Sequence, residues 1–295
     1  MDAKPEHLKP RDRVAVIAPA SPFDRRSLNR GLAFLKEMGL VPVPGKHLFD
    51  RKGYLAGSDE ARLEDLLWAL ETPEIRGVFF VRGGYGSIRI ATALIGRDFE
   101  PKVVMGFSDN CAVLFALSKR SVVFHGPHVC SPAFAEPSAR FKRWFAKALM
   151  TPKPIGYLPG KLRALREGSA EGRIVVCNLS VLTSSISTPI EPDLSSRIVI
   201  LEEVNEPPYR IDRMLTQLRM SGKLLSASAI VFGNMGVPLN RLRTALEPLL
   251  DEFAGPVFWG ASVGHIDENP PVPLGMTARL GSDIQKIEIL EAATL

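Results

Sequence analysis

The sequence predicts an α/β protein of two domains, and three observations lead to this prediction. Short apolar runs alternate with segments of helical periodicity through the first half of the chain, which is typical of a parallel sheet whose strands are connected by helices. A stretch rich in proline and glycine then interrupts the alternation. The chain has 295 residues, more than the roughly 100 to 200 of an ordinary domain, so two domains around separate cores are expected.

The first half of the chain alternates regularly between strand and helix patterns. Leucines at helical spacing follow the first apolar run, and Gly39 ends that helix. Ser58 can cap a second helix, which Pro73 ends. The predicted elements are strands at residues 14–18, 41–43, 77–81 and 103–106, and helices over 28–38, 58–70, 87–94 and from Asp109 onward.

The middle of the chain has the composition of a linker. Three prolines and four glycines occur in residues 151–172 without any sustained periodicity. This segment divides the chain into a first domain, residues 1–150, and a second domain, residues 173–295. The second domain is also expected to be mixed, with strands near 174–176, 198–201, 229–232, 257–259 and 287–290 and helices near 210–219 and 242–253.

Composition excludes several classes of protein. Hydrophobic residues make up 45% and charged residues 23%, as in ordinary globular proteins. The net charge is +5, but the 37 basic residues are scattered among 32 acidic ones, so no nucleic-acid partner is expected. Three widely spaced cysteines suggest thiols in a reducing compartment. No signal peptide and no apolar run of about 18 residues are present, so neither a membrane partner nor a location outside the cytoplasm is expected.

The segment Gly106-Phe107-Ser108-Asp109 resembles a nucleophile elbow, because a buried strand meets a serine that opens a helix. Such a turn exposes the serine at the carboxyl end of a strand and directs the next backbone N–H toward an oxyanion. A plain helix cap by the serine or the aspartate is the alternative.

A glycine-rich loop, Arg82-Gly83-Gly84-Tyr85-Gly86, follows the previous strand. It has neither the Lys-Ser/Thr ending of a phosphate loop nor the spacing of a dinucleotide fingerprint. Gly83 or Gly84 could donate a second N–H to an oxyanion hole, Arg82 could bind a terminal carboxylate, and Tyr85 could stack on a ligand. A tight structural turn is the alternative.

Two further candidates lie in the second half. Glu202 and Glu203 end a buried strand, where a carboxylate can orient a catalytic base, and His265 lies in a loop near the end of the chain. His125 and His128 have no acidic partner nearby in the sequence, so no metal site and no cofactor are expected.

The order Ser108, Glu202, His265 is the nucleophile, acid, base order of α/β hydrolases. Together with this order, several motifs resemble the serine LD-carboxypeptidases, a family that includes muramoyltetrapeptide carboxypeptidases and immunity peptidases that act on peptide-nucleotide antibiotics. The resemblance extends from about residue 14 to 280 and rests on RGGYG, GFSD, FHGP at 124–127, NLS at 178–180, LEE followed by PPYRIDRML, and GH followed by PLG.

The resemblance implies roles for these residues. Ser108 would be the nucleophile, His265 the general base and acid, and Glu202 the orienting carboxylate. The N–H groups of Asp109 and of a glycine at 83–84 would form the oxyanion hole. It also implies a doubly wound N-terminal domain, a swivel-like C-terminal α/β domain, an active site at their junction and a homodimer.

The chain departs from the family pattern at two places. Val176-Cys177 precedes Asn178 where the family commonly has Gly-Gly, and Asn110-Cys111 replaces a commoner Ile-Thr. Neither departure touches the expected triad, but both could shape the pocket, in which Asn178 is a candidate substrate-binding residue.

Three functions are compatible with these residues. The first is release of a terminal D-alanine from a cytoplasmic muropeptide tetrapeptide, across an L,D-peptide bond, during cell-wall recycling. The second is cleavage of an aminoacyl-nucleotide antibiotic conjugate, as in the immunity peptidases. The third is a two-domain ligand-binding protein without catalysis, against which the complete triad argues.

Overall fold

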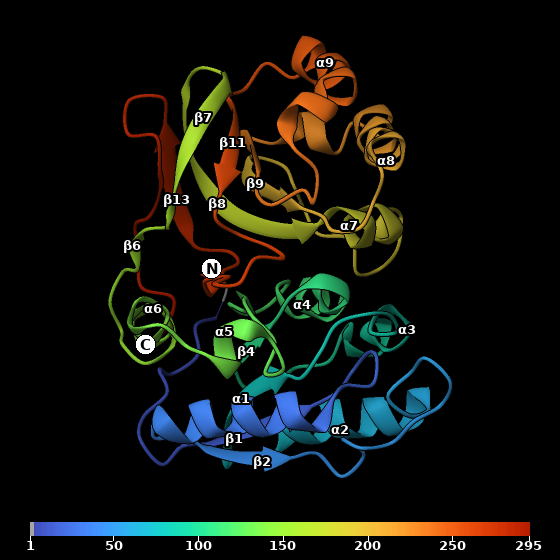
Figure 1. Cartoon of the computed structure of the whole chain (residues 1–295), viewed down its shortest axis with the longest axis vertical. Helices are drawn as coiled ribbons and strands as arrows, with labels where there is room; N and C mark the ends of the chain where they lie inside the picture. The colour runs from blue at the N-terminus through green and yellow to red at the C-terminus, as the bar shows by residue number, and fades with distance from the viewer. Residues whose placement is uncertain (1–2) are drawn as a thin grey trace.

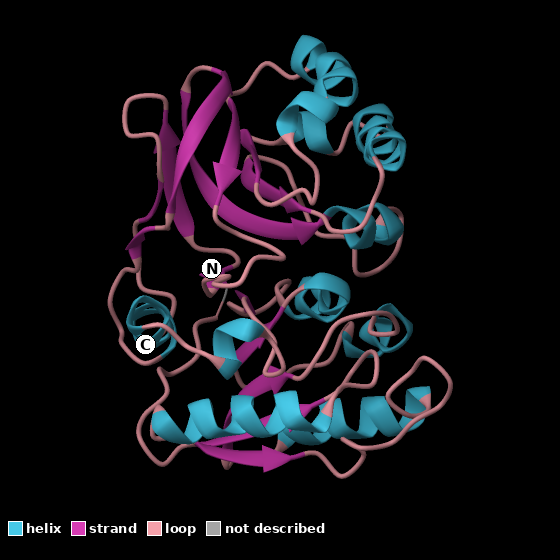
Figure 2. Cartoon of the chain, in the orientation of Figure 1, coloured by secondary structure: helices cyan, strands magenta, loops and turns pink. Residues whose placement is uncertain are grey.

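The computed structural model describes residues 3–295 and shows two β-sheets flanked by helices (Figure 1; Figure 2). Strands and helices alternate through the first half as the sequence predicts, which confirms the α/β fold class. The first sheet has the order β12-β5-β4-β3-β1-β2. Its strands are β1 (Arg13–Ile17), β2 (Val41–Pro44), β3 (Ile75–Phe80), β4 (Val103–Gly106), β5 (Phe124–His125) and β12 (Val272–Pro273).

Strands β1 to β5 of this sheet run parallel, and β12 pairs antiparallel with β5. From β1 the chain moves outward to β2, then returns to β3 on the other side of β1 and continues to β4 and β5. The strand order therefore reverses between β1 and β3, which makes the carboxyl ends of these two strands a topological switch point.

Helices connect the parallel strands, and polar side chains begin the longest of them. Asp24 accepts a hydrogen bond from the backbone N–H of Ser27, and Ser58 accepts one from that of Ala61, as predicted for the second helix. The helices of this half are α1 (Arg25–Glu37), α2 (Asp59–Glu71), α3 (Ile88–Ala91), η1 (Thr92–Leu94), η2 (Ser108–Asn110), α4 (Cys111–Leu117), α5 (Pro132–Ala135) and α6 (Ala139–Leu149).

The second sheet has the order β6-β14-β13-β8-β9-β10-β11-β7, with a parallel centre from β8 to β11 and antiparallel strands on both sides. Helices α7, α8 and α9 lie together along one side of it (Figure 1). The elements are β6 (Gly156–Tyr157), β7 (Gly160–Arg166), β8 (Ser169–Asn178), α7 (Leu179–Ser185), β9 (Arg197–Glu202), α8 (Pro208–Met220), η3 (Leu224–Ser226), β10 (Ala229–Phe232), η4 (Leu239–Arg241), α9 (Arg243–Glu252), β11 (Val257–Ala261), β13 (Thr277–Gly281) and β14 (Ile287–Ile289).

The segment expected to be a linker, residues 151–172, instead contributes strands to the second sheet. It contains β6, β7 and the start of β8. Gly156, Gly160 and Gly168 have φ angles of 72°, 104° and 144°, which residues with a side chain rarely adopt. These glycines therefore make turns beside short strands. The prediction of a linker was wrong because turns between strands are rich in glycine and proline, as linkers are.

The buried side chains form two clusters, but these clusters do not coincide with the two predicted domains. One cluster of buried side chains extends from the first sheet to one face of the second, and it includes Val78 and Phe79 of β3 as well as Ile174 and Val176 of β8. A second cluster fills the space between the other face of the second sheet and its helices. Within residues 3–295, no helix is both long and apolar enough to span a membrane.

Candidate active site

Ser108 stands on a strained turn at the carboxyl end of β4. Its φ angle is +58°, a left-handed conformation that is uncommon for a residue with a side chain and that often marks functional sites. The interpretation as a plain helix cap does not hold, because no side chain caps η2 or α4. The Asp109 carboxylate instead accepts a hydrogen bond from the backbone N–H of Ser87, at 2.8 Å. The turn thus directs Ser108 outward.

The structure brings Ser108, His265 and Glu202 into one hydrogen-bonded chain. His265 Nε2 lies 3.2 Å from Ser108 Oγ, and His265 Nδ1 lies 2.7 Å from Glu202 Oε2. The Glu202 side chain is fully buried, whereas that of His265 is 23% exposed. A nucleophile, a base within hydrogen-bond reach and a carboxylate that orients the base are the parts of an acyl-transfer site.

Glu202 is held from two further sides. Asn178 Nδ2 donates to Glu202 Oε1 at 3.1 Å, across the paired strands β8 and β9. Gly264 packs against the same carboxylate so closely that a Cβ there would lie 2.7 Å from Glu202 Oε2. Asn178 also caps α7, because its Oδ1 accepts from the N–H of Val181. These contacts fix the carboxylate that faces His265.

The neighbouring Glu203 faces away from His265. Its Oε2 accepts from the backbone N–H and the hydroxyl of Ser180, at 2.9 and 2.6 Å, and its Oε1 accepts from the N–H of Val204 at 2.8 Å. Burial raises the pKa of Glu203. Asn178 Nδ2 also donates to Glu203 Oε1, at 3.4 Å, so the two carboxylates share this partner. Only the Glu202 carboxylate lies within hydrogen-bond distance of His265.

The glycine loop after β3 lies directly against Ser108. A Cβ on Gly83 would lie 3.1 Å from Ser108 Oγ and 3.0 Å from His128 Cε1, so no side chain fits there. Gly84 has a φ of 100° and lines the same cavity as Ser108. Ser21, from the loop after β1, donates its N–H to the Gly83 carbonyl and holds this loop in place.

His125 and His128 surround the aromatic ring that precedes the nucleophile. The Phe107 ring lies 4.3 Å from that of His128, 5.6 Å from that of His125 and 4.8 Å from that of His265. Burial lowers the pKa of His125 to about 4 and that of His128 to about 3. Both rings are therefore neutral at pH 7 and support the elbow by packing.

The two departures from the family pattern do not line the cavity. Cys111 and Cys177 are fully buried among apolar side chains. Asn110 Nδ2 lies 3.0 Å from the carbonyl oxygen of Arg82 and 2.9 Å from His128 Nε2. Asn110 thus joins the turn at the nucleophile to the glycine loop, a role that sequence reasoning missed.

A cavity of about 400 Å³ opens beside Ser108, between the glycine loop and α7. Tyr85 and Asn178, two of the predicted substrate-binding residues, both line it. Glu206, which the sequence analysis did not single out, lines it as well. Among its lining residues, all within the described chain, three are acidic and none is Lys or Arg.

Arg82, the third predicted substrate-binding residue, lies in a different place. Its Nη1 donates to the carbonyl of Pro22 at 2.8 Å, and Arg82 lines a separate cavity formed by the loops after β1 and β2. The structure therefore does not bring Arg82 into the cavity that contains Ser108.

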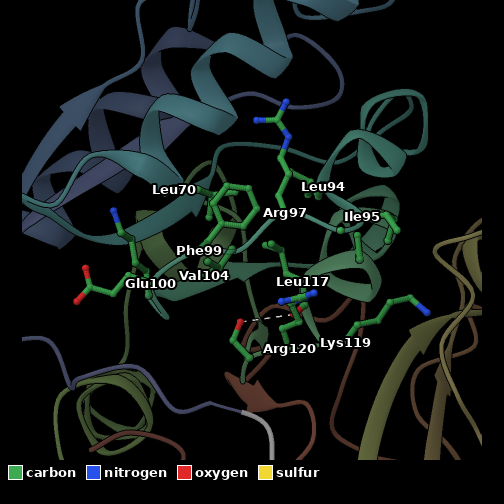
Figure 3. Close-up of a pocket in the computed structure, with 14 residues that line it drawn as sticks. Leu70, Leu94, Ile95, Arg97, Phe99, Glu100, Val104, Leu117, Lys119 and Arg120 are labelled. Carbon is green, nitrogen blue, oxygen red and sulfur yellow. Dashed lines mark hydrogen bonds between the residues drawn. The ribbon is translucent and has the colours of Figure 1, made fainter.

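A smaller pocket lies near the amino end of β4, the end of the strand that is farther from Ser108. Leu94, Phe99 and Leu117 contribute to its wall, while Arg97 and Glu100 extend away from it (Figure 3). Its volume of about 60 Å³ holds about two water molecules. It is too small for a peptide and remote from Ser108.

Known proteins resemble this chain over almost its whole length. Residues 14–126 match the LD-carboxypeptidase N-terminal domain, and residues 171–280 match the LD-carboxypeptidase C-terminal domain. A probable murein peptide carboxypeptidase of Bacillus subtilis is 37% identical over 99% of this chain and 95% of its own. A murein tetrapeptide carboxypeptidase of Pseudomonas aeruginosa is 32% identical over 91% of this chain and 92% of its own.

Solved structures agree with this. The muramoyltetrapeptide carboxypeptidase of Oxalobacter formigenes is 26% identical, with a TM-score of 0.78 over 94% of this chain and 97% of its own. An MccF-like protein of Bacillus anthracis shares the fold, with a TM-score of 0.87 and 23% identity over 97% of this chain and 99% of its own. MccF bound to glutamyl sulfamoyl guanosine also shares it, with a TM-score of 0.86 and 21% identity over 99% of each chain. The chain therefore belongs to the LD-carboxypeptidase family, and it is a serine-type LD-carboxypeptidase.

Proposed function

We propose that the enzyme removes the C-terminal residue of a muropeptide, hydrolysing the L,D-peptide bond before a terminal D-alanine. The observation that carries this proposal is the hydrogen-bonded chain from Ser108 through His265 to the buried Glu202. Relatives named as murein peptide and murein tetrapeptide carboxypeptidases support the substrate class.

The proposed reaction follows the course of serine acyl transfer. His265 Nε2 accepts the proton of Ser108 as its Oγ attacks the scissile carbonyl, and the same nitrogen then protonates the departing amine. Glu202 keeps the imidazole oriented and stabilises its charged form. Water releases the acyl group from Ser108 in a second cycle. The backbone N–H of Asp109 and one of the glycines at 83–84 stabilise the oxyanion, which is why this loop has to lie so close to the serine.

The charge of the catalytic cavity favours a muropeptide over an acidic aminoacyl conjugate. Asp109, Glu203 and Glu206 line it without any basic side chain among the described lining residues. A diamino acid before the scissile bond carries a free amine that suits such a cavity, whereas a glutamyl group would be repelled. The immunity-type activity remains the second candidate, because the fold is shared with MccF.

The setting of the reaction is also part of the proposal. We infer a cytoplasmic enzyme of cell-wall recycling that acts as a homodimer. Residues 1–150 would supply the nucleophile, and residues 173–295 the glutamate and histidine. Size measurement in solution, together with fractionation of the source cells, would test these assignments.

Incubation with a mixture of muropeptides, followed by mass spectrometry, tests the activity. The expected result is loss of one alanine from tetrapeptides only, and no reaction with Ser108→Ala, whose rate should fall by about 10⁴ to 10⁶. An aminoacyl sulfamoyl nucleotide in a parallel assay tests the second candidate. Unchanged tetrapeptides, or equal turnover by Ser108→Ala, would contradict the proposal.

A further inference from the structure

A second cavity, of about 620 Å³, lies at the switch point of the first sheet. The loop after β1, the loop after β2 and Arg82 after β3 surround it, so it lies outside the carboxyl ends of these three strands. In open α/β sheets this is the position where ligands bind. The cavity is therefore placed as a ligand site, although the catalytic residues do not line it.

Three guanidinium groups face this cavity. Arg82 is held by the Pro22 carbonyl, and the Arg25 guanidinium lies 4.6 Å from the centre of the exposed Phe49 ring. Within residues 3–295, none of Arg25, Arg51 and Arg82 forms an ion pair. Guanidinium groups that are already positioned and not neutralised suit carboxylates and phosphates, which they can bind through two hydrogen bonds.

The two carboxylates in the cavity wall already have partners. Asp24 begins α1 and accepts hydrogen bonds from the N–H and the hydroxyl of Ser27, at 2.8 and 3.0 Å. Asp50 lies 2.9 Å from His47 Nδ1, and this hydrogen bond raises the pKa of His47. Asp24 and Asp50 keep their own charges, so the three arginines and two aspartates of the wall carry a net formal charge of +1.

The cavity and the nucleophile candidate are connected through the glycine loop. Arg82 lines the cavity, and the next residue, Gly83, packs against Ser108. An extended peptide advances about 3.3 Å per residue, so a substrate residue two or three positions from the scissile bond can reach the arginines.

We propose that the Arg25, Arg51 and Arg82 cavity is a subsite for a carboxylate or phosphate group of the substrate, two or three positions away from the bond that is cleaved. This inference rests on the proposed muropeptide activity, because a muropeptide carries an internal carboxylate at such a distance. A nucleotide-linked muropeptide would present a diphosphate instead, which has the same chemistry for the arginines.

Three substrates with the same scissile bond test the proposal: a tetrapeptide with its internal carboxylate free, the same peptide with that carboxylate amidated, and the amidated peptide linked to a nucleotide diphosphate. For the wild type, kcat/KM should be about fivefold higher for either anionic substrate than for the amidated peptide, the size of one or two partly exposed ion pairs. A response to only one anion identifies the source that the cavity recognises.

Variants locate the effect. The single variants Arg25→Gln and Arg51→Gln should each lower the ratio, and the double variant Arg25→Gln/Arg51→Gln should bring it close to one. Arg26→Gln should keep the ratio, because it removes one positive charge, as each single variant does, from a residue that does not line the cavity. Equal kcat/KM for all three substrates in the wild type would overturn the subsite, and so would an equal loss of the ratio in Arg26→Gln.

Binding to Ser108→Ala, measured by calorimetry, separates the subsite from the activity. If the wild type cleaves none of the three substrates, the proposed function fails, yet tighter binding of an anionic form than of the amidated peptide would still support the cavity. Equal affinities, or no binding of any of them, would overturn it.

Discussion

Replacement of Glu202 by glutamine is the sharpest test of the triad. The change keeps the shape of the side chain but removes the charge that lies 2.7 Å from His265 Nδ1. In the proposed mechanism that charge stabilises the imidazolium formed when Ser108 loses its proton, and glutamine can also hold the ring in the wrong tautomer. We expect kcat to fall by about 10² to 10⁴, which corresponds to about 2.7 to 5.5 kcal/mol of transition-state stabilisation.

The matched variant, Glu203→Gln, should behave in the opposite way. Glu203 has no hydrogen bond to His265. Its Oε2 accepts from Ser180, and its Oε1 accepts from Val204 and Asn178. An amide group must turn an N–H toward one of these donors, which leaves a buried N–H unsatisfied at a cost of about 1 to 3 kcal/mol. We expect the free energy of unfolding to fall by this amount and kcat to change by less than about threefold.

Two measurements on each variant distinguish the outcomes. Steady-state kinetics with a tetrapeptide give kcat, and urea unfolding at pH 7 gives the free energy of unfolding. Glu202→Gln should lose activity and keep its stability, because it removes a fully buried charge without changing volume. Equal losses of kcat in the two variants, or a larger loss in Glu203→Gln, would show that Glu202 is not the orienting carboxylate.

Two further predictions concern the support of the site. Gly264→Ala should lower kcat/KM at least tenfold, because the added Cβ would overlap the Glu202 side chain. Gly222 also has a positive φ, but an added Cβ there would have no atom within 4 Å, so Gly222→Ala should lower only the stability. Equal activity of the two alanine variants would contradict this prediction. Below pH 6.5 the free energy of unfolding should fall, because the folded pKa values of about 4 for His125 and about 3 for His128 lie below the unfolded value, so the unfolded chain binds more protons. Each ring contributes about 1.4 kcal/mol per pH unit between its folded and unfolded pKa values. His125→Leu should therefore reduce, by the share of one ring, the slope of the free energy of unfolding against pH. An unchanged slope in urea unfolding measured from pH 7 to pH 5 would refute the assignment.

Local patterns predicted much of this site. The turn at Ser108 could be expected because strand, glycine, serine and helix follow one another within a few residues. The boundaries of β4, residues 103–106, agree with the apolar run from which they were predicted. The choice of Glu202 over Glu203 came only from the family resemblance, since the sequence leaves adjacent carboxylates equivalent until one face of the strand is known.

The parts that could not be predicted depend on register and on contacts distant in sequence. Asn178 reaches Glu202 because β8 and β9 pair with these two residues opposite each other, and a sequence does not reveal the register of a parallel pair. The same holds for Arg82, whose place beside the glycine loop suggested a substrate contact in the catalytic cavity. Its guanidinium is turned by the Pro22 carbonyl, 60 residues earlier in the chain.

The arrangement of the sheets explains why the triad spans so much of the chain. Ser108 follows β4 of the first sheet, and Glu202 ends β9 of the second. His265 lies between β11, which belongs to the second sheet, and β12, which pairs with β5 in the first. Its loop is thus fixed to both sheets. The 3.2 Å separation of His265 Nε2 from Ser108 Oγ therefore depends on how the two sheets pack. Glu202 and Gly264 hold the imidazole ring from the side of the second sheet. Substitutions in the shared core between the sheets should therefore alter the serine to histidine distance before they alter the histidine to glutamate distance.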